Sequence, residues 1–154
     1  MIPPDSALTE YTDAGNLPFA ELHRPWGLTY MKLISISRIT NTYVNIIKYT
    51  KGIRLPRHHH TGSVHAYTFS GAWRYLEYNW IAGPGSYVYE APGTNHTLEV
   101  LEDTTAMFVT QGANIYFDEK GEVSGWADAH TVLADVRVAL AKQGLTFDES
   151  IVKD

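Results

Sequence analysis

The chain has 154 residues, carries a formal net charge of −5 and contains no cysteine. This length suits a single domain. The negative charge, without a basic stripe, argues against a nucleic-acid partner, because such proteins present cationic surfaces to phosphates. The lack of cysteine excludes disulfides, thiolate zinc sites and cysteine nucleophiles. Imidazole and carboxylate therefore remain as the possible metal ligands.

The beginning of the chain differs from the rest in composition and in the pattern of its apolar residues. It lacks the charged and apolar regions of a signal peptide, and no apolar run approaches the ~20 residues of a membrane span. We therefore expect a soluble, cytoplasmic protein with no membrane contact. We expect residues 1–27 to form an irregular arm that packs on a neighbouring subunit, since they show little periodicity and hold four prolines, Pro3, Pro4, Pro18 and Pro25.

From residue 28 onward, segments rich in β-branched and aromatic residues recur about every ten residues, which is typical of strands. These segments read LTYMKLISIS, NTYVNIIKYT, VHAYTFS, AWRYLEY, SYVYE, HTLEV, TAMFVT and ANIYF. Turn-forming sequences separate them, namely Ser70-Gly71, Gly83-Pro84-Gly85, Ala91-Pro92-Gly93 and residues 118–121. Many short strands at even spacing predict an all-β protein, either an antiparallel barrel or a sandwich.

One helix is predicted over residues 128–143, near the end of the chain. Its apolar positions share one helical face, and Gly144 suits the position just after a helix. Those positions are Val132, Leu133, Val136, Ala139 and Leu140. Because one short helix cannot cover a parallel sheet, an α/β fold is excluded. Residues 28–154 are thus predicted to form one β domain with a C-terminal helix.

The stretch RHHHTGSVHAY, residues 57–67, contains four of the chain's seven histidines. His58 and His60 are two residues apart, so on a strand their side chains leave the same face, while His59 points to the other. A third candidate ligand is His96, which follows a Pro-Gly turn. If the two strands are neighbours in a barrel, three imidazoles can bind one metal ion and leave coordination positions open. Imidazole suits iron, zinc, copper and nickel alike.

Two stretches of the chain resemble the two motifs of the cupin superfamily. In the first, Gly52 precedes the HxH pair and Gly71 closes the motif; in the second, Gly85 precedes a Pro-Gly turn that leads to His96. The resemblance implies a single cupin barrel, a double-stranded β-helix or jelly roll. Most metal-binding cupins carry a ligand glutamate in the first motif, whereas this chain has Val64 there and His65 one position later.

Residues 50–145, and above all the string from LPRHHHTGSVHAY to APGTNHTLEV, are similar to the 2,4'-dihydroxyacetophenone dioxygenase-like cupins. The resemblance implies one Fe(II) held by His58, His60 and His96, with zinc, nickel or manganese as alternative metals. It also implies dioxygen-dependent cleavage of a carbon–carbon bond next to a carbonyl, in a small substrate such as a hydroxyaryl ketone. Two alternatives stay open: a metal-dependent cupin isomerase or lyase, and a non-catalytic cupin that binds a metal or small ligand.

Four further predictions concern residues around this site. Glu90, on the strand that leads to His96, is either a catalytic base or a residue that supports the metal ligands, or else a solvated or ion-paired carboxylate at a strand end. Glu77 has a weaker claim to the role of base. His65 would be a fourth ligand only if the strand register shifted by one residue. Otherwise we expect it to be partly buried with a local hydrogen-bond partner. The aromatic strand residues favour core packing and subunit contacts, so we expect a homodimer or homotetramer.

Overall fold

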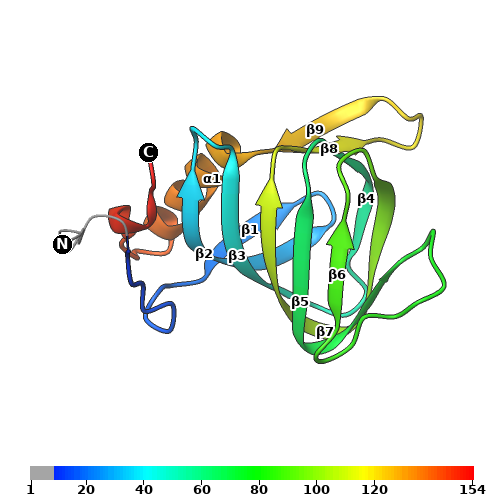
Figure 1. Ribbon diagram of the computed structural model, residues 1–154, viewed down its shortest axis with the longest axis horizontal. Coiled ribbons are helices and arrows are strands. Elements are labelled where there is room, and N and C mark those ends of the chain that lie inside the picture. Colours follow the sequence, from blue (N-terminus) through cyan, green and yellow to red (C-terminus); the bar gives the residue numbers. More distant parts are fainter. Residues whose placement is uncertain (1–8) are drawn as a thin grey trace, which may run out of the picture.

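The structure, a computed structural model, describes residues 9–154. In this part of the chain an antiparallel sheet curls into a cupin-like barrel, with a single α-helix against one side (Figure 1). The strands are β1 (Ala20–Arg24), β2 (Gly27–Ser37), β3 (Thr42–Tyr49), β4 (Arg54–His60), β5 (Val64–Tyr75), β6 (Tyr87–Glu90), β7 (Asn95–Gln111), β8 (Asn114–Phe117) and β9 (Val123–Ala127). The helix α1 (Ala129–Lys142) follows, and a 3-10 turn, η1 (Glu149–Ile151), lies near the end. The predicted all-β barrel with one C-terminal helix is confirmed.

Strand β7 organises the barrel because it pairs with three other strands. Its first half pairs with β4, its second half with β3, and β5 pairs along most of its length, always antiparallel. The sheet continues from β4 through β8 to β9 on one side and from β3 through β2 to β1 on the other, while β6 pairs with β5. This arrangement brings the two predicted histidine segments, on β4 and β7, next to each other.

The predicted segment VHAYTFS and the first four residues of AWRYLEY form one strand, β5, so the turn expected at Ser70-Gly71 is wrong. The chain instead passes through β-bulges here, since the register with β7 shifts between Thr68 and Trp73. Gly71 has φ +85°, and a Cβ on this residue would lie 2.2 Å from the carbonyl oxygen of Asp103. A glycine at a bulge permits this backbone and this close approach.

The expectation of an irregular arm over residues 1–27 is wrong for its last part. Residues 20–24 form β1, which pairs with β2 from Ala20 opposite Met31 to Arg24 opposite Gly27. Alternation explains this strand, because Ala20 and Leu22 are buried while Glu21 and His23 between them are exposed. Residues 1–8 of the predicted arm lie outside the described residues.

The predicted helix is confirmed as α1. Asp128 is its N-cap, and its side chain accepts a hydrogen bond from the backbone N–H of Thr131, so the helix begins as the sequence indicates. Gly144 follows the helix with φ +72°, as a residue after a helix often does. The buried face of α1 packs against β1 and β2 (Figure 1). In the described residues no helix has the length and apolar character needed to cross a membrane.

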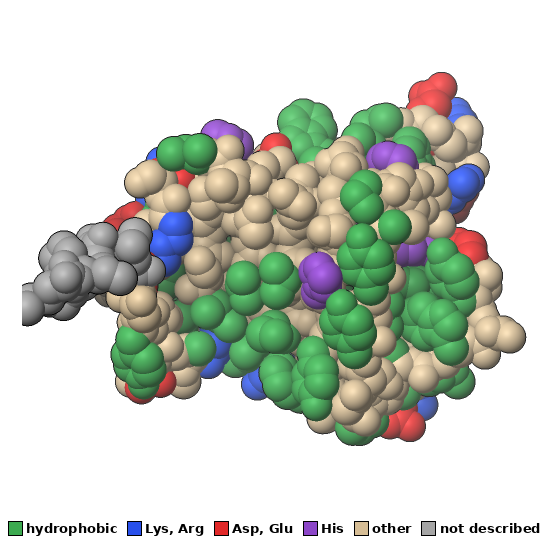
Figure 2. All heavy atoms as spheres, in the orientation of Figure 1, with side chains coloured by type: hydrophobic (Ala, Val, Ile, Leu, Met, Phe, Trp, Pro, Cys, Tyr) green, Lys and Arg blue, Asp and Glu red, His purple; other side chains and the backbone are tan. Residues whose placement is uncertain are grey.

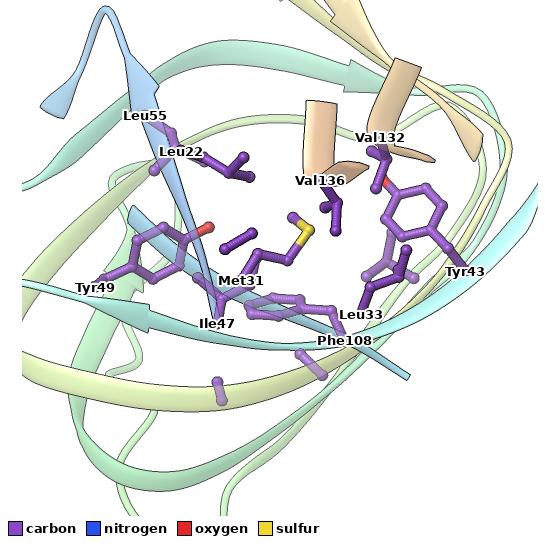
Figure 3. Packing of buried hydrophobic residues seen from close by; sticks show 14 of the residues in the cluster. Leu22, Met31, Leu33, Tyr43, Ile47, Tyr49, Leu55, Phe108, Val132 and Val136 are labelled. Carbon is purple, nitrogen blue, oxygen red and sulfur yellow. The ribbon is translucent and has the colours of Figure 1, made fainter. Parts of the chain in front are cut away.

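The hydrophobic core lies inside the barrel and under the helix. Val132 and Val136 of α1 project toward the same space as Met31, Ile47 and Tyr43 of the strands (Figure 3). Large apolar residues also remain outside, because the strand alternation of β5 and β6 places aromatic side chains on their outer faces. Figure 2 shows hydrophobic side chains gathered on this side of the molecule. Those on β5 and β6, between 41% and 61% exposed, are Tyr67, Phe69, Tyr87 and Tyr89.

Candidate metal centre

Three histidines from two strands meet inside the barrel. His58 and His60 lie on β4 and His96 lies on β7, where His58 and His96 are direct cross-strand neighbours. All three are at most 3% exposed, and one ring nitrogen from each lies within 4.8 Å of the others. His59 takes the opposite face, as the spacing predicts, and its Nδ1 donates a hydrogen bond to Asn95 Oδ1 at 3.2 Å. The structure thus brings together all three predicted metal ligands.

The protein orients the donor atom of one ligand directly. His58 Nδ1 donates a hydrogen bond to the carbonyl oxygen of Pro56 at 2.9 Å, which leaves Nε2 of this ring as the lone-pair atom. Burial, together with the neighbouring His60, lowers the pKa of His58 to about 3. The ring is therefore uncharged near neutral pH, which is the form that binds a metal.

The other two imidazoles face each other at a distance that suits metal binding. Nε2 of His60 lies 2.9 Å from Nε2 of His96. Two nitrogens bound to one ion at ~2.1 Å, at right angles, would lie about 3.0 Å apart. When neither nitrogen carries a proton, two lone pairs at this distance repel each other unless a cation lies between them. The donor set therefore fits a bound metal ion, and it suits several divalent metals.

Glu90 lies beside these histidines and is 3% exposed, so the alternative of a solvated carboxylate is wrong. Its Oε2 lies 2.9 Å from His60 Nε2 and 3.5 Å from His96 Nε2. Burial raises the pKa of the Glu90 carboxyl, but the two adjacent imidazoles outweigh burial and hold the pKa well below its ordinary value. Glu90 is the direct cross-strand partner of Val64, the position where the first cupin motif lacks its glutamate. The neighbouring strand thus supplies a carboxylate next to the histidines.

Tyr75 is a site residue that the sequence pattern does not indicate, because an aromatic residue on a strand favours core packing or a subunit contact. Its hydroxyl donates a hydrogen bond to Oε1 of Glu90, and its ring stacks on His96 with 3.5 Å between centroids and 11° between planes. Both contacts are buried. Tyr75 therefore holds one ligand candidate and the adjacent carboxylate in place.

Two other candidates lie outside the site. His65 is exposed on the outer face of β5, so it is not a fourth ligand, and the expectation of partial burial is wrong. The expected local partner is present, because His65 Nδ1 lies 2.6 Å from the Tyr87 hydroxyl. Glu77 is also exposed, and its Oε2 accepts a hydrogen bond from the backbone N–H of Thr97 at 2.9 Å. Its position gives it no access to the histidine cluster.

The histidines border a cavity of about 480 Å³ inside the barrel, and His58, His60 and Glu90 form part of its wall. The rest of the wall is largely aromatic and aliphatic, with a few polar side chains. The β8–β9 hairpin also contributes to the wall, through residues on both sides of its turn. A second cavity, of about 390 Å³, borders Tyr75, Glu90 and His96. The volume and the largely apolar wall of the first cavity suit a small, mostly apolar ligand.

Comparisons with known proteins agree with this architecture. A profile of the ChrR cupin-like domain family matches residues 8–114. No curated protein sequence matches the chain. A solved RmlC-like cupin protein from Ralstonia eutropha JMP134 has a TM-score of 0.84 and 28% identity, with 92% of each chain covered.

Two further solved structures are similar at lower identity. An acetylacetone dioxygenase from Acinetobacter johnsonii has a TM-score of 0.70 and 18% identity, over 85% of this chain and 91% of that one. The anti-sigma factor ChrR of Rhodobacter sphaeroides, solved with SigE, has a TM-score of 0.51 and 15% identity, over 62% of this chain and 50% of that one. At these identities the likeness concerns the fold alone. Because the family profile covers more than half of the sequence, the chain belongs to the family of ChrR cupin-like domains, within the cupin superfamily.

Proposed function

We propose that the chain is a non-haem Fe(II)-dependent dioxygenase that cleaves the carbon–carbon bond beside a carbonyl in a small substrate, such as a hydroxyaryl ketone. The observation that carries the proposal is the convergence of three buried imidazoles, His58, His60 and His96, of which His58 and His60 lie in the wall of an internal cavity. The sequence similarity to the 2,4'-dihydroxyacetophenone dioxygenase-like cupins supports it. The fold shared with an acetylacetone dioxygenase agrees with it.

In this proposal His58, His60 and His96 hold the iron through their ring nitrogens. A bound metal ion supplies Lewis acidity and a place where the substrate oxygens and dioxygen come together. His60 Nε2 cannot bind the ion and also donate a hydrogen bond to Glu90. Oε2 of Glu90 lies 2.9 Å from His60 Nε2. When the metal occupies that nitrogen, Oε2 is free to accept the proton that leaves the group beside the substrate carbonyl. The Tyr75 hydroxyl holds the carboxylate in this orientation by donating a hydrogen bond to its other oxygen, Oε1.

The reaction balances without a further reductant. For an α-hydroxy ketone, the bond between the carbonyl carbon and its hydroxyl-bearing neighbour breaks. Dioxygen is the oxidant, and its two atoms enter the two products, which are both carboxylic acids. The aromatic ring is unchanged. The largely apolar wall of the cavity suits such a ring and limits the access of water to the reacting groups.

The test is dioxygen uptake by protein purified without oxygen and reloaded with Fe(II). With 2-hydroxyacetophenone or acetylacetone as probe, we expect uptake that depends on added Fe(II), with one dioxygen consumed per substrate cleaved. The variant His96→Ala should lose this uptake, whereas His59→Arg should keep it because His59 faces away from the cluster. No uptake with either class of ketone, in protein shown to hold iron, would contradict the proposal.

A second candidate function is a non-catalytic domain that binds a metal or small ligand. The matching family profile, which describes the cupin-like domain of ChrR, is the observation that favours it. Under this alternative the protein retains a metal ion but consumes no dioxygen and converts no ketone. An isomerase or lyase that uses zinc, nickel or manganese would instead convert a substrate without dioxygen.

A further inference from the structure

A buried amide whose oxygen has no protein partner among the described residues lies in the wall of the cavity. Asn45, on β3, is 1% exposed, and its Oδ1 has no hydrogen-bond partner among residues 9–154. It borders the same cavity as His58 and His60. A buried polar atom without a partner is unfavourable, so native proteins rarely keep one without a reason.

Strand register gives the position of Asn45 relative to the metal centre. Glu90 on β6 belongs to a row of inward-facing residues that runs across four paired strands. The other members of this row are Val64 on β5, Thr110 on β7 and Tyr43 on β3. The next inward row contains Asn45, Phe108, Ala66 and Val88. Asn45 is therefore two residues along the strands from the row of Glu90, about 7 Å, and three strands away, about 14 Å around the curved sheet. It lines the cavity from a different strand, and from a different inward row, than Glu90.

The neighbours of Asn45 offer it no hydrogen bond. Its cross-strand neighbours are Leu33 on β2 and Phe108 on β7, both apolar. The inward-facing residues on either side along β3 are Tyr43 and Ile47, and no hydrogen bond joins either of them to the Asn45 side-chain oxygen. The amide oxygen thus lies between apolar cross-strand neighbours, without a hydrogen-bond partner in the wall. Such an isolated polar group in an apolar cavity is typical of a ligand-orienting residue.

We propose that Asn45 forms a second recognition site in the cavity, which binds a hydroxyl group at the end of the substrate remote from the metal. A hydroxyl both donates and accepts a hydrogen bond, so it can pair with either end of the amide. The assignment to a hydroxylated aryl ketone rests on the proposed function. A ligand without the hydroxyl would leave the amide unpaired, and sites built in this way reject such ligands strongly.

The experiment measures binding rather than turnover, with zinc-loaded protein and two probes, 4'-hydroxyacetophenone and acetophenone. Calorimetric titration should show the hydroxylated probe binding about 10-fold more tightly than acetophenone, the size expected for one satisfied buried hydrogen bond. In Asn45→Leu the two probes should bind equally. Asn45→Asp, which keeps an oxygen acceptor, should retain the preference.

A matched control uses Asn114, a second asparagine in the same cavity wall with an unpaired Oδ1. It is the cross-strand partner of His60, so it lies near the metal end of the cavity. The variant Asn114→Leu should keep the 10-fold preference between the probes even if both bind less tightly. Loss of the preference in this variant, with retention in Asn45→Leu, would overturn the proposal.

Stability gives an independent readout. If Asn45 serves a ligand, Asn45→Leu removes an unpaired buried amide and should raise the melting temperature of the ligand-free protein by about 2–4 °C. A structural role for Asn45 predicts a lower melting temperature or failure to fold, and either result would overturn the proposal. So would an equal preference in wild type and Asn45→Leu, or no binding of either probe to the wild type. Preferential binding through Asn45 without dioxygen uptake would instead refute only the dioxygenase.

Discussion

The hydrogen bond between Tyr75 and Glu90 can be tested with one substitution that changes little else. Tyr75→Phe removes the hydroxyl that donates to Oε1 of Glu90. It keeps the ring, and therefore the stacking on His96 at 3.5 Å. Any difference between the variant and the wild type thus reports the hydrogen bond itself.

The expected loss follows from burial and charge. Glu90 is 3% exposed and Tyr75 is 2% exposed, so water cannot replace the lost donor without rearrangement of the barrel. A hydrogen bond to a charged group contributes about 1.5–3 kcal/mol to the free energy of unfolding. For a chain of this size, 1 kcal/mol corresponds to about 2–4 °C. We therefore expect the melting temperature of Tyr75→Phe to fall by about 3–12 °C.

The assay is thermal unfolding followed by circular dichroism, in a metal chelator so that metal binding does not contribute. Tyr78→Phe is the matched control: it deletes the same hydroxyl three residues later, on a side chain that is 45% exposed. This control should change the melting temperature by less than about 2 °C, as surface substitutions usually do. Equal shifts in the two variants would refute the reasoning that Tyr75 holds a buried carboxylate.

Three further predictions concern the metal, the bulge and the assembly. At a free metal concentration 100 times the dissociation constant, metal binding should stabilise the wild type and His59→Arg by about 2.7 kcal/mol. It should stabilise His96→Ala much less. Equal stabilisation of all three proteins in thermal unfolding would contradict the ligand assignment. Gly71→Ala should destabilise the fold by more than about 1 kcal/mol in denaturant unfolding, because its Cβ would lie 2.2 Å from the Asp103 carbonyl oxygen; an unchanged midpoint would contradict this. We expect a homodimer or homotetramer through the exposed aromatic face of β5 and β6, and sedimentation equilibrium that finds only monomer would refute it.

The histidine site could be predicted largely from local sequence. The HxH spacing places His58 and His60 on one face of any extended strand, whatever the rest of the chain does. His96 required more, because only the pairing of β4 with β7 brings it opposite His58. The resemblance to the two cupin motifs supplied that long-range information.

The role of Tyr75 could not be predicted, because β-bulges interrupt the alternation of β5. Val64, Ala66 and Thr68 are buried at every second residue, whereas after the bulges the buried residues are Trp73 and Tyr75. The odd-numbered residues thus replace the even-numbered ones on the inner face. A period of two read from the start of the strand would place Tyr75 outside.

Glu90 shows a different limit of sequence reasoning. A glutamate at the end of a strand is usually solvated, and only the surrounding strands bury this one. Its partners, His60 and Tyr75, come from β4 and β5, so the environment of the carboxyl is a property of the folded barrel. Strand β1 is difficult to predict for a local reason, because its alternation from Ala20 to Arg24 is short and prolines lie close to both of its ends.

The most direct test of the central claim is anomalous diffraction at the iron absorption edge, from crystals of protein purified without oxygen. The account predicts one strong peak per chain, within bonding distance of Nε2 of His58, His60 and His96. Crystals of His96→Ala grown in the same way should lack it. An anomalous peak at another position, or no anomalous peak in wild-type crystals soaked with Fe(II), would contradict the claim that these three imidazoles form a metal site.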